Sequence, residues 1–179
     1  MADANRSGAY ATAIYVVANA EGHLSSVGDE LFAVARAIEG SDALRDALGD
    51  PHLPAERRQQ VIEELLGSRS SDVTLAVASM VVAAGRGREL PAIVDALLEM
   101  SAAREGRQVA EVRSAIDLTE DQRNRLAAAL QSATGQEVDV RVVVDPTVVG
   151  GLVARVGDQV IDGSVRHRLA QLRESLSAR

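Results

Sequence analysis

The sequence lacks cysteine and lysine altogether. Without cysteine the chain can form neither a disulfide framework nor a reactive thiolate. Without lysine it cannot hold a phosphate group in the manner of the GxxxxGK(S/T) nucleotide loop. All 19 cationic residues are therefore arginine, which we attribute to the base composition of a GC-rich genome rather than to a requirement for guanidinium groups.

Aromatic residues are also scarce, at 2% of the sequence, whereas hydrophobic residues make up 46%. The core must therefore be built from alanine, valine, leucine and isoleucine, which suits closely packed helices and a small sheet. The length of 179 residues allows one medium domain or two small ones.

Long apolar runs are missing as well. The longest apolar-leaning run, residues 73–84, has twelve residues, whereas a membrane-spanning helix needs about 20. Residues 1–7 are polar and do not resemble a targeting segment. We therefore expect a soluble chain that reaches a membrane only through its partners.

Positively charged residues are fewer than acidic ones in the first half of the chain. Residues 1–106 contain 16 acids and nine arginines, a net charge of −7, whereas residues 107–179 contain ten of each. An acidic first half and a neutral second half argue against nucleic acid as the main partner.

The first half shows a helical period interrupted by glycine and proline. Apolar residues recur every three to four positions, which predicts helices. We expect six of them, forming a bundle over residues 1–106, at residues 10–17, 24–38, 41–48, 54–66, 71–84 and 90–98.

The second half, residues 107–179, changes to a period of two. Alternation predicts strands at residues 108–118 and 138–144, separated by a helix that starts at a Thr119–Gln122 capping box. A hairpin at residues 148–161 and a final amphipathic helix follow. The fold class is therefore α+β: a six-helix bundle followed by a small α/β domain of order β-α-β-β-β-α.

Catalytic and cofactor motifs are not recognisable in the sequence. The three histidines, at positions 23, 52 and 167, lack the spacing of metal ligands. The glycine-rich segment at residues 150–158 matches neither nucleotide-binding motif, and we interpret its glycines as structural. We expect no enzyme activity, cofactor, metal or nucleotide.

The fifth predicted helix has almost no polar face. A helix that is apolar all round is either fully buried or covered by something else. It is therefore either the central helix of the bundle or one wall of a groove, shared with the first helix, that accepts a helix from a partner. The pattern alone leaves both alternatives open.

The C-terminal string GGLVARVGDQVIDGSVRHRLAQL closely resembles the signature of the delta subunit of F-type ATP synthases, the family of the mitochondrial oligomycin-sensitivity conferring protein. The segment SGAYATAIYVVA resembles the first helix of the same family. The signature residues that match, besides Leu172, are Gly150, Gly151, Arg155, Gly157, Asp158, Asp162, Gly163, Ser164 and Arg168.

This resemblance implies a non-catalytic stator subunit that links the catalytic alpha/beta head to the b-subunit stalk at the cytoplasmic face of the bacterial cell membrane. In this family the N-terminus of the alpha subunit binds across helices one and five, and the C-terminus of the b subunit binds the C-terminal domain. The alternative is an unrelated two-domain adaptor that captures a partner helix. The residues expected to line the alpha-subunit site are Tyr10, Ala13, Ile14, Val17, Val77 and Met80.

Overall fold

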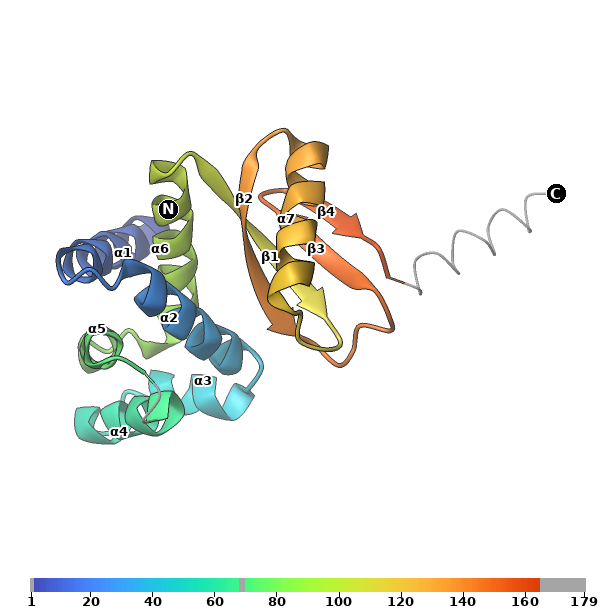
Figure 1. Cartoon of the computed structure of the whole chain (residues 1–179). Coiled ribbons are helices and arrows are strands. Elements are labelled where there is room, and N and C mark those ends of the chain that lie inside the picture. The colour runs from blue at the N-terminus through green and yellow to red at the C-terminus, as the bar shows by residue number, and fades with distance from the viewer. Residues whose placement is uncertain (1, 68–69, 165–179) are drawn as a thin grey trace. The chain divides into compact units, whose positions relative to one another are not determined.

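The computed structural model describes residues 2–67 and 70–164. It is an α+β structure in which a helical region precedes a small mixed sheet (Figure 1). The chain divides into two compact units between Ser101 and Ala102. Each unit is described by itself below.

The helical unit contains a helix at each of the six places predicted from the sequence. A short 3-10 turn, η2 (Gly87–Glu89), precedes the last of them. No helix in the described part of the chain is both long and apolar enough to cross a membrane. The six helices are α1 (Ala2–Ala20), α2 (Leu24–Glu39), α3 (Asp42–Gly49), α4 (Ala55–Leu66), α5 (Asp72–Ala83) and α6 (Leu90–Arg104).

Side-chain caps set the start of two of these helices. The Ser41 Oγ accepts a hydrogen bond from the Leu44 amide and so caps α3. The Ser71 Oγ accepts one from the Thr74 amide and caps α5. Such caps satisfy amides that the helix itself leaves without partners, and each contributes about 1 kcal/mol.

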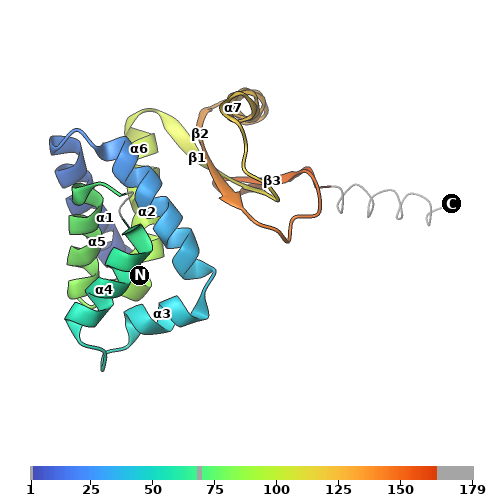
Figure 2. The same ribbon diagram turned by 60° about the horizontal axis from the view of Figure 1, so that its bottom comes forward.

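Helix α2 holds the helical unit together. It contacts α1, α3, α4 and α5, and its buried face includes Leu31 and Ile38, both 0% exposed. Helix α5 lies beside α1 and contacts α2 and α4 as well (Figure 2). The central position in this unit therefore belongs to α2, and α5 is buried on one face only, through Thr74, Val77, Ala78, Val81 and Val82.

The described part of the second unit contains a four-stranded sheet with the helix α7 (Glu120–Thr134) on one face (Figures 1 and 2). The strand order is β2-β1-β3-β4; β1 pairs with β2 in parallel, and the other two pairs are antiparallel. The strands are β1 (Arg107–Ser114), β2 (Glu137–Val144), β3 (Leu152–Val156) and β4 (Gln159–Asp162).

Helix α7 begins at the capping box that the sequence predicts. The Gln122 amide donates to the Thr119 Oγ1 at 3.3 Å, and the Thr119 amide donates to the Gln122 Oε1 at 2.9 Å. The helix then packs on the sheet through Leu130, which joins a core of small and branched side chains: Ala110, Val112, Val138, Ala154 and Val156.

Two predicted strand boundaries are wrong. The first strand ends at Ser114 instead of continuing to residue 118, and β3 begins at Leu152 instead of residue 148. Gly150 and Gly151 have φ angles of +64° and +77°, which an extended strand does not allow. The glycine pair therefore precedes the strand instead of interrupting it. The predicted final helix lies outside the described residues.

Candidate functional site

The six residues expected to bind a partner helix divide into two groups. Ile14 on α1 and Val77 on α5 are buried, at 0% and 3% exposure, and belong to the core of the helical unit. Ala13 is exposed and Tyr10 is half-buried. Of these six residues, Tyr10, Ala13, Val17 and Met80 therefore reach the protein surface, whereas Ile14 and Val77 do not.

Large apolar side chains are exposed on this surface. Val16, Val17 and Met80 are 60%, 44% and 43% exposed, and no other large apolar side chain described in the helical unit is as open. All three belong to α1 and α5, which contact each other. We call the half-buried Tyr10 and the exposed Ala13, Val16, Val17 and Met80 together the α1/α5 surface. Val16 was not among the residues predicted from the sequence. It lies three positions after Ala13, a spacing that places two residues on one helix face.

A carboxylate on α2 holds the start of α5 in place. One oxygen of Glu30 accepts hydrogen bonds from the amide and the hydroxyl of Ser71, at 3.0 and 3.1 Å. The Ser71 hydroxyl also lies 2.9 Å from that of Thr74, which is completely buried. Partial burial raises the pKa of Glu30, but the hydrogen bonds from Thr74 and Ser71 outweigh this and lower it below its ordinary value.

Replacing Glu30 with alanine is expected to reduce the free energy of unfolding of the helical unit by about 1–2 kcal/mol at pH 7, because the two Ser71 donors lose their acceptor. Since the folded-state pKa is lowered, this stabilisation is fully present above the ordinary value of 4.5 and is lost as the pH falls through the folded-state pKa. Urea unfolding followed by tyrosine fluorescence measures it at each pH. Glu63→Ala, at an exposed position of α4, is the control. The difference in the free energy of unfolding between the wild type and Glu30→Ala should shrink from pH 7 to pH 3. If it stays the same, the Glu30 carboxylate does not stabilise the helical unit in the way described.

The far end of α5 is tied to α1. The Arg86 guanidinium donates to the Glu89 carboxylate at 2.6 Å. Glu89 and, to a smaller extent, the Tyr10 hydroxyl raise the pKa of Arg86. Tyr10 thus connects the α1/α5 surface to the turn that follows α5.

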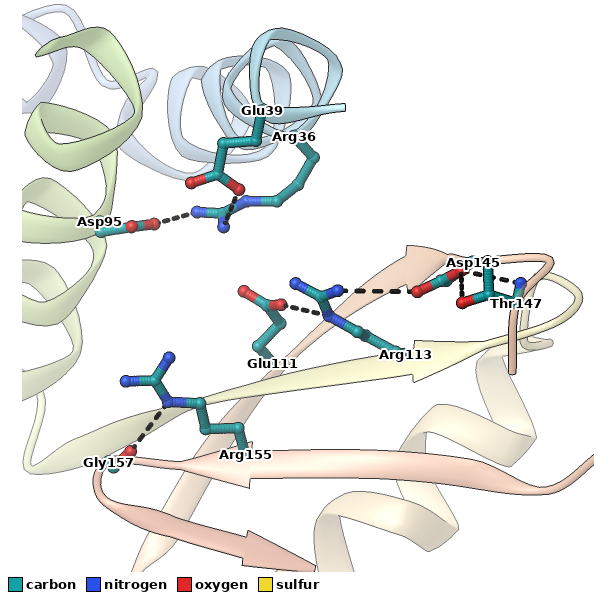
Figure 3. Close-up of polar contacts among 9 residues, drawn as sticks. All are labelled: Arg36, Glu39, Asp95, Glu111, Arg113, Asp145, Thr147, Arg155 and Gly157. Carbon is teal, nitrogen blue, oxygen red and sulfur yellow. Dashed lines mark hydrogen bonds and ion pairs between the residues drawn. The ribbon is translucent and has the colours of Figure 1, made fainter. Parts of the chain in front are cut away.

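Arg36 joins α2 to α6 (Figure 3). Its guanidinium pairs with Asp95 on α6 and lies 2.7 Å from a carboxylate oxygen of Glu39. The same group stacks over the Phe32 ring at 5.0 Å from the centroid. A planar cation with several simultaneous partners is well suited to hold two helices together.

The glycines of the C-terminal signature have a structural explanation. A Cβ added at Gly151 would lie 2.5 Å from the Gly163 carbonyl oxygen and 3.1 Å from the Ser164 Cα. The Gly163 amide donates to the Leu152 carbonyl at 3.0 Å, which extends the β3–β4 pairing to this point. Gly151 therefore lets two backbone segments approach more closely than any side chain would allow.

The remaining described signature residues shape the β3–β4 hairpin. Gly157 has a φ of +55° and precedes Asp158 in a two-residue turn, since Val156 pairs with Gln159. The Arg155 Nε donates to the Gly157 carbonyl at 3.3 Å (Figure 3). The Asp162 Oδ1 accepts from the Ser164 amide at 2.9 Å. Arg168 and Leu172 lie outside the described residues.

Groups of side chains that could hold a metal ion are not found in residues 2–67 and 70–164. No three residues among the histidines and carboxylates of this part lie together as a metal site would require. His52 pairs with Asp50, 3.1 Å away, in an exposed turn. The glycine segment contacts its own hairpin backbone, as described above, and does not form an open loop before a helix.

The protein is thus an α+β chain of two units: the first exposes apolar side chains on two contacting helices, and the second contains a mixed sheet in which two strands form a hairpin shaped by glycines. The family model for the ATP synthase delta (OSCP) subunit matches residues 7–176. The chain belongs to this family, as its signature residues indicated. This membership excludes the alternative of an unrelated adaptor.

Curated relatives agree with the family model. The chain is 45% identical over 156 residues to the ATP synthase subunit delta of Nocardia farcinica, covering 87% of this chain and 58% of that protein. It is 41% identical over 165 residues to the subunit of the same name in Kineococcus radiotolerans, covering 92% and 60%. The chain thus spans about three-fifths of the length of these relatives.

A solved structure has the same fold over almost the whole chain. It is a chain of the mitochondrial ATP synthase hexamer of Toxoplasma gondii, determined by cryo-electron microscopy. The TM-score is 0.56 at 29% identity, and the match covers 97% of this chain and 98% of that one.

Proposed function

We propose that this chain is a non-catalytic stator subunit of the proton-translocating F-type ATP synthase, linking the catalytic alpha/beta head to the b-subunit stalk. The observation that carries the proposal is the α1/α5 surface: the most exposed large apolar side chains described in the helical unit lie on two adjoining helices. The partners named here are those that the resemblance to the family implies. The subunit would be peripheral, at the cytoplasmic face of the bacterial cell membrane.

The head would bind through the N-terminal helix of the alpha subunit. An amphipathic helix recognises a partner by laying its apolar face against exposed apolar side chains. Val16, Val17 and Met80 supply those side chains, and the small Ala13 between Tyr10 and Val17 lets a second helix come close. Burying three half-exposed side chains would contribute on the order of 3 kcal/mol.

The stalk would bind through the second unit, at the C-terminus of the b subunit. We expect no bond chemistry and no nucleotide or nucleic-acid binding by this chain. Its role would be mechanical: holding two large assemblies together against the torque of the rotor.

Titration of the full chain with a peptide from the alpha-subunit N-terminus tests the head contact. We expect saturable one-to-one binding by calorimetry and no heat from a peptide of the same composition in scrambled order. Equal heats from the two peptides, or none from either, would contradict the proposed contact.

We also propose that residues 1–106 form one six-helix bundle and residues 107–179 a separately folded domain. Helix α6 ends at Arg104 and β1 starts at Arg107, so that only the exposed Glu105 and Gly106 lie between them. Exposed links between domains are preferred sites of proteolysis.

Limited trypsin digestion is expected to cut first after Arg104 or Arg107. The N-terminal fragment should keep a helical circular dichroism spectrum, because its buried side chains all come from α1–α6. Early cleavage elsewhere, with this link intact, or a fragment without helical signal, would argue against two independent domains.

A further inference from the structure

Strand β2 lies at one edge of the sheet. In the part of the chain that the structure describes, β1 pairs with one side of β2 and no strand pairs with its other side. Every residue of β2 pairs with β1 without a break and none has a positive φ angle, so the strand has no bulge. It contains no proline, and five of its eight residues are valine. A long, regular edge of this kind presents a row of amides and carbonyls that can pair with another strand.

The two faces of β2 carry different side chains. Val138 and Val140 face α7, since Val138 belongs to the core of the second unit and Val140 packs against that core. Asp139 and Arg141 alternate with them and therefore lie on the opposite face. Their side chains are 31% and 13% exposed, and the Arg141 Nη2 donates to the Asp139 Oδ2 at 2.8 Å. The edge strand thus carries one acid and one base, two positions apart, on the same face.

Symmetry restricts how a second copy of the chain could join this edge. A copy related by a twofold axis must place its β2 antiparallel to the first. A slip of one residue would set the apolar face of one copy against the charged face of the other, so only residues on the same face can lie opposite each other. Two such registers pair nearly the whole strand. One is centred on Val140 and the other on Arg141.

Charge distinguishes these two registers. In the register centred on Arg141, the guanidinium groups of the two copies lie opposite each other, and like charges in that position repel. In the register centred on Val140, the Asp139 of each copy lies opposite the Arg141 of the other. Glu137 then lies opposite Val143, so no like charges are opposed. Because Asp139 and Arg141 are partly buried, salt screens their attraction less than it would screen a fully exposed pair.

We propose that the free edge of β2 is the docking site of a second copy of this chain, whose β2 pairs with it antiparallel in the register centred on Val140. The two sheets then form one continuous sheet, in which each Asp139 lies beside the Arg141 of both copies. The proposal concerns the chain by itself, outside any larger assembly, and stands independently of the stator role.

Sedimentation of the full chain with two complementary variants tests the docking. The wild-type average mass should rise towards twice that of one chain as the concentration increases. Asp139→Arg gives a chain with two cations at these positions, and Arg141→Asp gives a chain with two acids. Either variant alone opposes like charges in both pairs, so its dimer should have a dissociation constant at least about tenfold larger. An equimolar mixture of the two variants restores both opposite-charge pairs and should associate as the wild type does.

The controls are Asp121→Arg and Arg125→Asp on α7. These side chains pair at 3.0 Å and are 70% and 80% exposed, so the substitutions change charge equally but away from the edge. Both should associate as the wild type does. The proposal is overturned if the wild type stays monomeric, if the single β2 variants associate unchanged, or if their mixture associates no more tightly than either alone. Equal weakening by the α7 variants would also overturn it, because net charge would then be the cause.

Hydrogen exchange of the wild type covers the case in which a β2 variant fails to fold, which circular dichroism detects. Alternate amides of β2 face away from β1, and they form hydrogen bonds only when another strand pairs with that edge. These amides should exchange more slowly at high protein concentration, whereas the amides of α7 should not change. The same exchange rates of the β2 amides at low and high concentration would rule out pairing at this edge.

Discussion

Replacing Gly151 with alanine is expected to destabilise the second unit by about 2–5 kcal/mol. The backbone at this position has a φ of +77°, which costs a residue with a side chain about 1–2 kcal/mol. The new Cβ would also lie 2.5 Å from the Gly163 carbonyl oxygen. Backbone atoms must move to relieve that contact, and overpacking of this kind costs about 1–3 kcal/mol more.

Gly157→Ala is the matched control. Its φ of +55° imposes a similar backbone strain, but a Cβ there would meet nothing within 4 Å. We therefore expect this variant to lose only about 1–2 kcal/mol. Hydrogen exchange of the β1 and β3 amides reports the stability of the second unit. A loss for Gly151→Ala no larger than that for Gly157→Ala would refute the close approach of the two segments.

The chain provides an internal reference for this comparison. Both tyrosines, Tyr10 and Tyr15, lie on α1, and the single phenylalanine, Phe32, lies on α2. Intrinsic fluorescence therefore reports the helical unit alone. Its urea midpoint should be the same in both glycine variants, because the substitutions lie in the other unit.

Ala13→Asp is expected to lower the affinity for the alpha-subunit peptide at least a hundredfold. Ala13 is exposed in the free chain, so the carboxylate remains hydrated and the variant should fold. In the complex the carboxylate would be buried against the apolar face of the peptide without a partner, which costs several kcal/mol. A factor of one hundred requires about 2.7 kcal/mol.

The control for Ala13→Asp is the same substitution at Ala43, an exposed residue of α3. Calorimetric titration should give the wild-type dissociation constant for Ala43→Asp and a much larger one for Ala13→Asp. Unchanged peptide affinity of a folded Ala13→Asp chain would remove Ala13 from the proposed contact.

Helix positions could be predicted from the sequence because each helix has its own local signals. Apolar residues at helical spacing, cap residues such as Ser41 and Ser71 and a breaker after each helix all act within a few residues of one another. The Thr119–Gln122 capping box is of the same kind, and the structure forms it as predicted.

The strand ends and the exposed face of α1 could not be predicted in this way. Residues 115–118 continue an alternating pattern, but β1 ends where its neighbours β2 and β3 stop pairing with it. On α1 and α5 apolar residues occur all round, so spacing does not show which side the other helices cover. Packing buries Ile14 and Val77 and leaves Val16 open, and only the tertiary structure decides this.

The glycine signature could be recognised from the sequence, but its structural role could not be inferred from neighbouring residues alone. Gly151 and Gly163 are twelve positions apart, and the need for two glycines becomes evident only when β3 and β4 pair.

The central claim is that this chain connects two assemblies, and a bridging assay measures that connection directly. The C-terminal segment of the b subunit is immobilised, and the catalytic alpha/beta head is passed over it with and without the chain. We expect the head to be retained only when the chain is present, and far less with Ala13→Asp than with Ala43→Asp. Retention of the head without the chain, or its loss in the presence of the wild-type chain, would contradict the stator role.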